Sequence, residues 1–170
     1  MTKVVFEDDC LTPDRTIRID FKGPNPFRFY SEIVMILRDI LEIRRLNIYE
    51  REFRWEIQTD PRLFFYRVWA RKPYDAYTDA YVELIFQGKQ PTDITKDGEM
   101  VIFITAKIRT SMPENTVWQR SQLYKSLRWL YFRLFYNDAR RTLLNKCIHH
   151  IELIEERLRH VLGITPPIQT

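Results

Sequence analysis

The sequence predicts an α+β domain in which a curved antiparallel sheet grips a long C-terminal helix, with the elements in the order strand, helix, four strands, helix. Three observations predict this fold class. Residues 49–58 and 100–108 alternate apolar and polar side chains, as half-buried strands do. Residues 27–44 repeat apolar side chains at intervals of three and four, as an amphipathic helix does. Residues 116–162 contain neither glycine nor proline and follow a helical pattern.

The first strand and helix come from the N-terminal quarter of the chain. The stretch TIRIDF (16–21) alternates isoleucine and phenylalanine with charged residues, and VVF (4–6) is read as a further short strand. The stretch KGPNP (22–26) is a turn that delivers a proline to the first turn of a helix. The apolar stripe of that helix consists of Phe27, Tyr30, Ile33, Val34, Leu37 and Leu41.

Four further strands are predicted over 49–58, 62–71, 80–88 and 100–108, with a polar loop at 89–99. Short polar connections between alternating segments are typical of an antiparallel meander. One face of such a sheet meets a core while the other meets water. The expected core-facing residues are Phe53, Trp55, Ile57, Phe64, Tyr66, Val68, Ala70, Val82, Leu84, Phe86, Met100, Ile102, Ile104, Ala106 and Ile108.

The last helix is predicted over 116–162, and Gly163 stops it before a flexible tail at 163–170. Residues 1–162 then form a single domain, for which 170 residues suffice. This helix carries two apolar stripes on roughly opposite sides. The first stripe, expected to lie on the sheet, is Leu123, Leu127, Leu130 and Leu134. The second is Trp129, Phe132, Tyr136, Leu143, Cys147, Ile151, Ile154 and Leu158.

The length of this helix leaves two alternatives open. An unbroken helix over 116–162 is about 70 Å long, roughly twice the width of a compact domain of this size. Either the helix breaks near Asn137-Asp138 and folds back, or it projects and meets another subunit. We expect the second alternative. The second stripe, from Trp129 to Leu158, is then the interface of a homodimer, because an apolar patch of that extent is not left in water.

Charge and cysteine usage narrow the functional classes. Residues 116–170 carry nine basic and four acidic side chains, so the positive excess lies in the C-terminal segment. The aromatic and basic segment 120–146 suggests a nucleic-acid surface, but its cations scatter round the helix, which weighs against that function. Cys10 and Cys147 lie far apart without a CxxC motif, so neither zinc nor a disulfide is indicated. A cytoplasmic location is expected, since neither a signal peptide nor a transmembrane segment is recognised.

No motif for catalysis is found. The sequence lacks a GxSxG motif and a glycine-rich phosphate loop, so we expect no enzymatic activity and no cofactor. Four residues of the last helix share one face at metal-ligand spacing, namely His149, Glu152, Glu156 and His160. The first helix offers few matching ligands, so this face is interpreted as solvated and no metal site is expected.

The element order resembles the helix-grip, START-like superfamily, which includes the birch-pollen-allergen-like proteins. The likeness is carried by TIRIDF, by the helix start GPNPFRFYSEIVMIL, by the strands from Tyr49 to Ile108, and by the helix from Thr116. The resemblance implies an apolar cavity between sheet and helix that holds a lipid-like or aromatic molecule. Its walls would be Phe53, Trp55, Phe64, Tyr66, Ile102, Ile104, Leu127 and Leu134. The alternative is that these side chains simply fill the core.

The expected function is therefore a non-catalytic protein that holds a hydrophobic or lipid-like small molecule. An alternative is a protein–protein interaction or oligomerisation module that uses the C-terminal helix. A nucleic-acid-binding protein that uses residues 120–146 is the least favoured reading.

Overall fold

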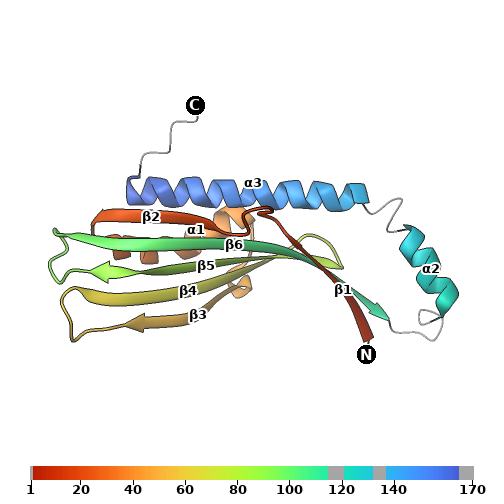
Figure 1. Cartoon of the computed structure of the whole chain (residues 1–170), viewed down its shortest axis with the longest axis horizontal. Helices are drawn as coiled ribbons and strands as arrows, with labels where there is room; N and C mark the ends of the chain where they lie inside the picture. Colours follow the sequence, from red (N-terminus) through yellow and green to blue (C-terminus); the bar gives the residue numbers. More distant parts are fainter. Residues whose placement is uncertain (1, 115–120, 132–136, 165–170) are drawn as a thin grey trace.

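A computed structural model describes residues 2–114, 121–131 and 137–164 of the chain. It shows a curved antiparallel sheet with helices on one face, an α+β architecture as expected (Figure 1). The strands are β1 Thr2–Asp9, β2 Ile17–Pro24, β3 Ile48–Trp55, β4 Arg62–Pro73, β5 Thr78–Gln90 and β6 Asp97–Glu114. The helices are η1 Pro26–Ser31, α1 Ile33–Leu41, η2 Arg45–Asn47, α2 Gln122–Tyr131 and α3 Asn137–Leu162.

The sheet is a meander extended by two N-terminal strands. Strands β3, β4, β5 and β6 pair in sequence order, and both β1 and β2 pair with β6. Strand β2 pairs with the first half of β6, through Ile17 and Ile104, and β1 pairs with its second half, through Asp9 and Lys107. The two strands therefore follow one another along a single edge of β6. The short strand expected at residues 4–6 is thus a full member of the sheet, which the predicted element order did not include.

The inner face of β4, β5 and β6 agrees with the alternation in the sequence. Every second residue is buried under the helices, from Phe64 in β4 to Ile108 in β6. Strand β3 departs from this pattern because it is the edge of the sheet and its register shifts between Glu50 and Glu52. Ile57, expected in the core, lies beyond the end of β3 and is 70% exposed.

The helix expected over 27–44 is divided into the 3-10 helix η1 and the shorter α-helix α1. Asn25 adopts the left-handed conformation before Pro26, and Glu42 adopts it after Leu41, so the backbone changes direction at both ends. Phe29 of η1 is fully buried although the three-and-four spacing did not select it, whereas Tyr30 is 39% exposed.

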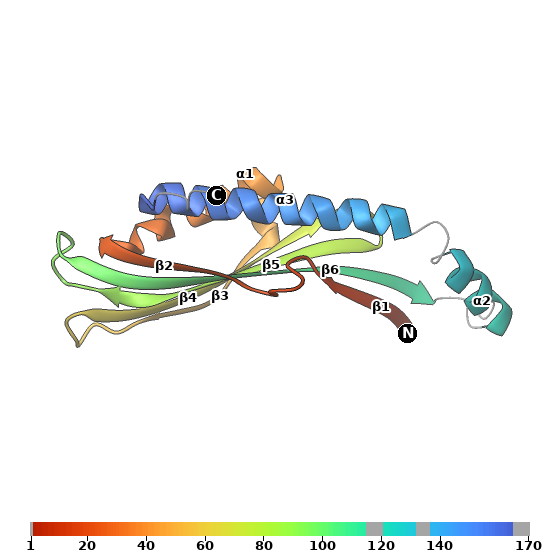
Figure 2. The same ribbon diagram turned by 45° about the horizontal axis from the view of Figure 1, so that its top comes forward.

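The single helix expected over 116–162 is replaced by two helices. Strand β6 continues to Glu114, α2 covers Gln122–Tyr131, and α3 starts at Asn137, near the alternative break point. The two helices do not lie along one another: α2 lies beyond the end of the sheet and α3 lies over it (Figures 1 and 2). Gly163 ends α3 with a φ of 72°, and the Ile164 N–H donates to the Arg159 carbonyl, as predicted for a glycine stop.

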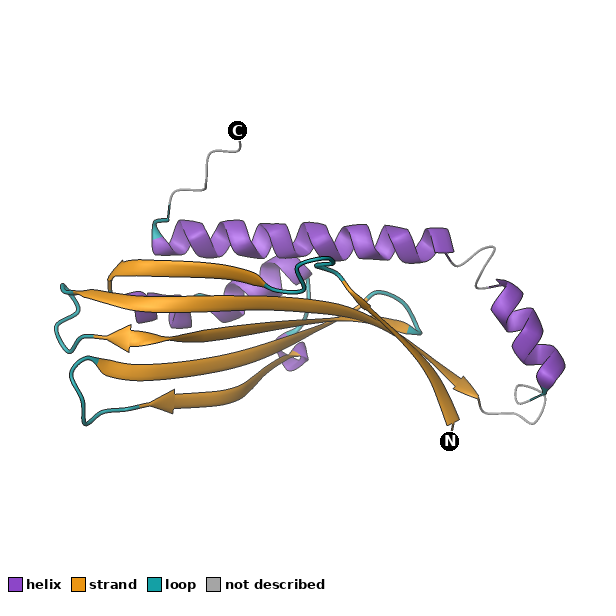
Figure 3. Cartoon of the chain, in the orientation of Figure 1, coloured by secondary structure: helices purple, strands orange, loops and turns teal. Residues whose placement is uncertain are grey.

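Helix α3 covers the inner face of the sheet beside α1 (Figure 3). It packs against α1, η1 and β6. Its buried stripe is Cys147, Ile151, Ile154, Leu158 and Leu162, all at most 2% exposed, with Leu143 and Leu144 packed at the edge of the core. This stripe was expected to meet another chain. That expectation is wrong for these residues, because α3 packs on α1, η1 and β6 and the stripe closes the core of its own domain.

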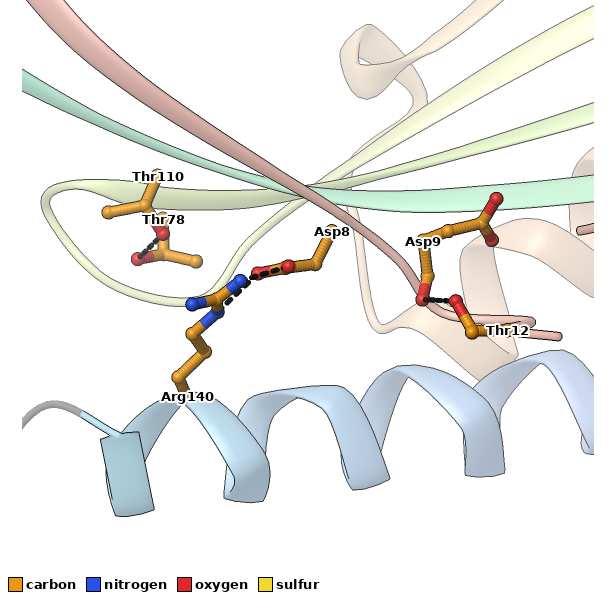
Figure 4. A network of polar contacts seen from close by, with 6 residues as sticks. All are labelled: Asp8, Asp9, Thr12, Thr78, Thr110 and Arg140. Atoms are coloured by element: carbon orange, nitrogen blue, oxygen red, sulfur yellow. Dashed lines mark hydrogen bonds and ion pairs between the residues drawn. The ribbon is translucent and has the colours of Figure 1, made fainter.

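Two cross-links fasten α3 to the N-terminal strands. Cys10 and Cys147 form a disulfide across a sequence separation of 137 residues, with Cα atoms 6.1 Å apart. The sequence analysis did not expect these two cysteines to pair, and that expectation is wrong. Two turns earlier on the helix, the Arg140 guanidinium donates to the Asp8 carboxylate of β1 (Figure 4). The disulfide holds the segment between β1 and β2 against α3, and the Arg140–Asp8 contact holds the end of β1 there.

Candidate functional site

The residues expected to line a ligand cavity do not surround a common space. Phe64, Tyr66, Ile102 and Ile104 are at most 4% exposed and belong to the core. Phe53 and Trp55 lie on the edge strand, and Phe53 is 49% exposed. Leu127 lies on α2, 56% exposed and away from the sheet (Figure 2). Leu134 lies outside the residues that the structure describes.

Aromatic rings fill the space beside these strands. The Phe29 and Phe86 rings stack with centroids 3.9 Å apart, and Phe27 meets Trp55 edge to face at 4.5 Å. Tyr66 contacts the rings of Phe29, Tyr30, Phe53 and Phe86 at 5.2 to 6.2 Å. The edge-to-face contacts of Phe27 with Trp55 and of Tyr66 with Tyr30 have the arrangement that aromatic pairs prefer. The cluster therefore has the character of a packed core.

One polar atom inside this cluster is unusual. The Tyr66 hydroxyl is buried and has no hydrogen-bond partner within the described part of the chain. Burial, reinforced by the nearby Glu50 carboxylate, raises the pKa of Tyr66 well above its ordinary value, so the hydroxyl stays neutral.

Replacing Tyr66 with phenylalanine tests whether that hydroxyl serves any interaction. If it is unsatisfied, Tyr66→Phe is expected to leave the free energy of unfolding unchanged or to raise it by about 1 kcal/mol, because a buried, unpaired polar group is removed. Urea denaturation measures the change. A loss of more than about 1 kcal/mol would contradict this and indicate that the hydroxyl has a partner.

The outer face of the sheet, which lies away from the helices, is a second candidate surface. It carries arginines stacked on rings, with Arg51 over Trp69 at 4.5 Å and Arg54 over Phe65 at 4.9 Å. Glu83 accepts hydrogen bonds from Arg67 Nε and Trp69 Nε1. Further ion pairs cross or follow the strands, namely Arg18–Asp20, Lys22–Glu99, Arg54–Glu52, Arg71–Asp79 and Arg109–Glu7. The charges and rings of this face satisfy one another, as on a solvated face of an antiparallel sheet.

Helix α2 presents the clearest unburied apolar surface. Ser121 precedes it, and the Ser121 hydroxyl accepts a hydrogen bond from the Tyr124 N–H at 3.2 Å, as an N-cap does. Leu123, Leu127 and Leu130 are 62%, 56% and 45% exposed, and their spacing of four and three places them on one side. These leucines were expected to lie on the sheet, which is wrong, because α3 takes that place. We call Leu123, Leu127 and Leu130 the leucine stripe.

The aromatic part of the expected partner interface is only partly described. Trp129 lies on α2 and is 59% exposed. Phe132 and Tyr136 lie outside the described residues. The exposed apolar surface near the expected interface is therefore on α2, while the part of the expected interface on α3 is buried within the domain.

The structure offers no metal-binding cluster within residues 2–114, 121–131 and 137–164. His149 and Glu152, two of the residues that share a helical face, lie 3.9 Å apart on the exposed side of α3. In the same part of the chain, no helix combines the length and the hydrophobicity needed to cross a membrane.

Comparisons with known proteins add little to this picture. Neither a protein-family model nor a curated protein sequence matches the chain. A solved structure of a Staphylococcus aureus protein of unknown function aligns over 87% of this chain and 94% of its own, with 9% sequence identity and a TM-score of 0.24. Similarity at this level carries no argument, so the resemblance to the helix-grip superfamily stays a prediction.

Proposed function

We propose that the protein is a non-catalytic interaction module that forms a homodimer through α2. The observation that carries this proposal is the leucine stripe, three leucines on one side of a helix that each remain about half exposed or more. Burying a leucine side chain completely is worth about 1.5–3 kcal/mol, so a stripe of this kind favours association. Lys125 lies two residues from both Leu123 and Leu127, so it projects from the side of α2 opposite the stripe and leaves the stripe uncharged.

The oligomeric state of a single variant tests this proposal. Leu127→Glu is expected to raise the dimer dissociation constant at least tenfold in sedimentation equilibrium, because it places a charge in the leucine stripe that the dimer would bury. Since Leu127 is exposed, the variant stays folded, and its circular dichroism spectrum matches that of the wild type. The matched control is Gln122→Glu, which adds the same charge at an exposed position of α2 away from the stripe and leaves the dimer intact.

Two outcomes would contradict the proposal. A wild type that is monomeric at concentrations of about 100 μM does not self-associate. If that monomer co-sediments with vesicles of phosphatidylcholine and phosphatidylserine, and Leu127→Glu does not, the stripe binds an anionic membrane surface instead.

A second candidate function is the binding of a hydrophobic molecule, as the sequence predicts. The unpaired Tyr66 hydroxyl favours it, because a carbonyl or hydroxyl of a bound molecule would satisfy that group. The packing of the surrounding rings weighs against it. Native mass spectrometry of the purified protein distinguishes a bound molecule from a core filled by side chains, since a ligand adds its mass to that of the folded chain.

The cytoplasmic location expected from the sequence also stays a proposal. Disulfides persist mainly in oxidising compartments, so the pairing of Cys10 with Cys147 weighs against a reducing one. Alkylation of free thiols at the moment of cell lysis tests the proposal. Reduced cysteines would agree with the cytoplasm, and an intact disulfide would contradict it.

A further inference from the structure

We infer that His150 and Tyr74 form a pH-sensitive latch that holds α3 on the β4–β5 hairpin and weakens when His150 takes up a proton. The Tyr74 hydroxyl and His150 Nδ1 lie 3.2 Å apart, and the two rings are nearly parallel at a centroid distance of 6.2 Å. The contact joins two elements of the fold across 76 residues of sequence. It is independent of α2 and of the proposed homodimer.

The hairpin holds Tyr74 in a fixed position. Tyr74 follows the last residue of β4, and its backbone N–H donates to the Thr78 carbonyl at 2.9 Å. Within the turn, the Asp75 carboxylate accepts the N–H groups of Tyr77 and Thr78, both at 2.7 Å. The Tyr74 side chain is half-buried against the core. Burial raises the pKa of Tyr74 to about 12, so its hydroxyl keeps its proton and can donate it to a hydrogen bond.

His150 lies on the side of α3 that faces the rest of the domain. It stands three residues after Cys147 and four before Ile154, which are both buried, and its own side chain is half-buried. In the neutral ring with its proton on Nε2, the Nδ1 lone pair accepts the hydrogen bond of the Tyr74 hydroxyl. Protonation occupies that lone pair, so the Tyr74 hydroxyl can no longer donate to the ring.

The surroundings of the imidazole oppose its protonation. Lys72 of β4 faces it from the sheet, Lys146 and His149 adjoin it on α3, and Glu42 faces it from the residue that follows α1. Burial, followed by the charge of Lys72, lowers the pKa of His150 below its ordinary value. Glu42 acts in the opposite direction, but its side chain is 80% exposed and already lies 3.5 Å from the Lys72 ammonium.

The packing of α3 on the hairpin therefore depends on pH. Above about pH 6.5, the ordinary pKa of histidine, His150 is neutral in the folded and the unfolded chain, and the latch is intact. Below that pH the unfolded chain takes up the proton more readily than the folded chain, because the pKa of His150 is lowered in the fold. The free energy of unfolding then falls until the pH has passed the lowered pKa. Mild acid loosens α3 from the hairpin.

An NMR titration of the three histidines tests the charge environment. The imidazole of His150 is expected to titrate at a lower pH than those of His149 and His160, which are exposed on the same helix. Lys72→Met removes a facing cation and is expected to raise the pKa of His150. The matched change Lys146→Met removes a cation of weaker influence and raises it less. If His150 titrated together with His149 and His160, the inference would be overturned.

Melting temperatures at about pH 7.5 and 5.5 test the latch itself. The wild type is expected to lose about 2 °C or more beyond the loss of His150→Asn between these two pH values. Asparagine offers Tyr74 a neutral acceptor that does not titrate, so the variant lacks the pH-dependent part. The control His160→Asn removes an exposed histidine of the same helix and keeps the loss of the wild type. An equal loss in all three proteins would contradict the inference.

Hydrogen exchange measures whether protonation opens this contact in particular. After correction for the intrinsic effect of pH, the Tyr74 amide and the α3 amides from Cys147 to Ile154 are expected to lose more protection in mild acid than the Ile102 amide of β6. In His150→Asn this difference is expected to disappear. If the pKa of His150 is lowered but these amides keep their protection, His150 is a buried histidine that holds nothing in place, and the inference fails.

Discussion

Reduction of the Cys10–Cys147 disulfide is expected to lower the free energy of unfolding by about 2–5 kcal/mol, which corresponds to a fall in melting temperature of roughly 10 °C. The cross-link closes a loop over a sequence separation of 137 residues, and the chain-entropy cost of such a closure is about 5 kcal/mol in the unfolded state. Both cysteines are almost completely buried, so the thiols remain packed against the core after reduction.

Thermal denaturation with and without reductant measures this difference. The control is the double variant Cys10→Ala/Cys147→Ala, whose melting temperature is the same in both conditions because it has no disulfide to lose. Mass spectrometry after alkylation establishes the redox state of each sample. A wild type that contains two free thiols under oxidising conditions would contradict the pairing, as would equal stability of the verified oxidised and reduced forms.

Shortening a side chain in the buried stripe of α3 is the second change with a large expected effect. Ile151→Ala is expected to cost about 2–5 kcal/mol, because Ile151 is fully buried and its removal leaves a cavity where α3 meets the core. Ile148→Ala makes the same substitution in the same helix at a position that is 36% exposed. We expect this control to cost less than about 1 kcal/mol.

Urea denaturation of the two variants gives the comparison. If Ile151→Ala and Ile148→Ala lowered the free energy of unfolding by the same small amount, α3 would not be docked on the sheet in solution. If instead Ile151→Ala weakened dimerisation without loss of stability, the stripe from Cys147 to Leu158 would be an intermolecular surface, as the sequence alone suggested. The burial of α3 predicts that its stripe contributes to stability, and we propose that association uses α2.

The inner face of the sheet could be predicted because its pattern is local. Successive side chains of a strand point to opposite faces, so the alternation around Tyr66, Leu84 and Ile102 specifies which residues share a face, whatever the strand pairs with. The end of α3 at Gly163 is local in the same sense, since a left-handed residue and two nearby backbone hydrogen bonds suffice. The predicted burial of Ile57 was wrong, because burial at the edge of a sheet depends on how far the neighbouring elements extend.

The candidate site was less predictable. The periodicity of residues 123–130 and 143–158 shows that each stripe is apolar, but it does not show what covers it. The sequence analysis assigned the leucine stripe to the sheet and the stripe from Cys147 to Leu158 to a partner. In the structure the stripe from Cys147 to Leu158 is buried in the domain and the leucine stripe is exposed, because β6 extends to Glu114 and α3, not α2, lies over the sheet. The contact of Tyr74 with His150 was not recognised, since the two residues are distant in sequence.

By itself, the sequence determined the α+β class, the faces of the central strands and the apolar stripes of the helices. These properties follow from backbone geometry over a few residues. The tertiary structure alone decided that β1 and β2 share one edge of β6, that Cys10 meets Cys147, and that α3 rather than α2 covers the sheet. Each of these depends on contacts between segments far apart in the chain. The free energy of such contacts depends on which surfaces the turns bring together. The apolar periodicity of a single helix or strand contains no information about that pairing.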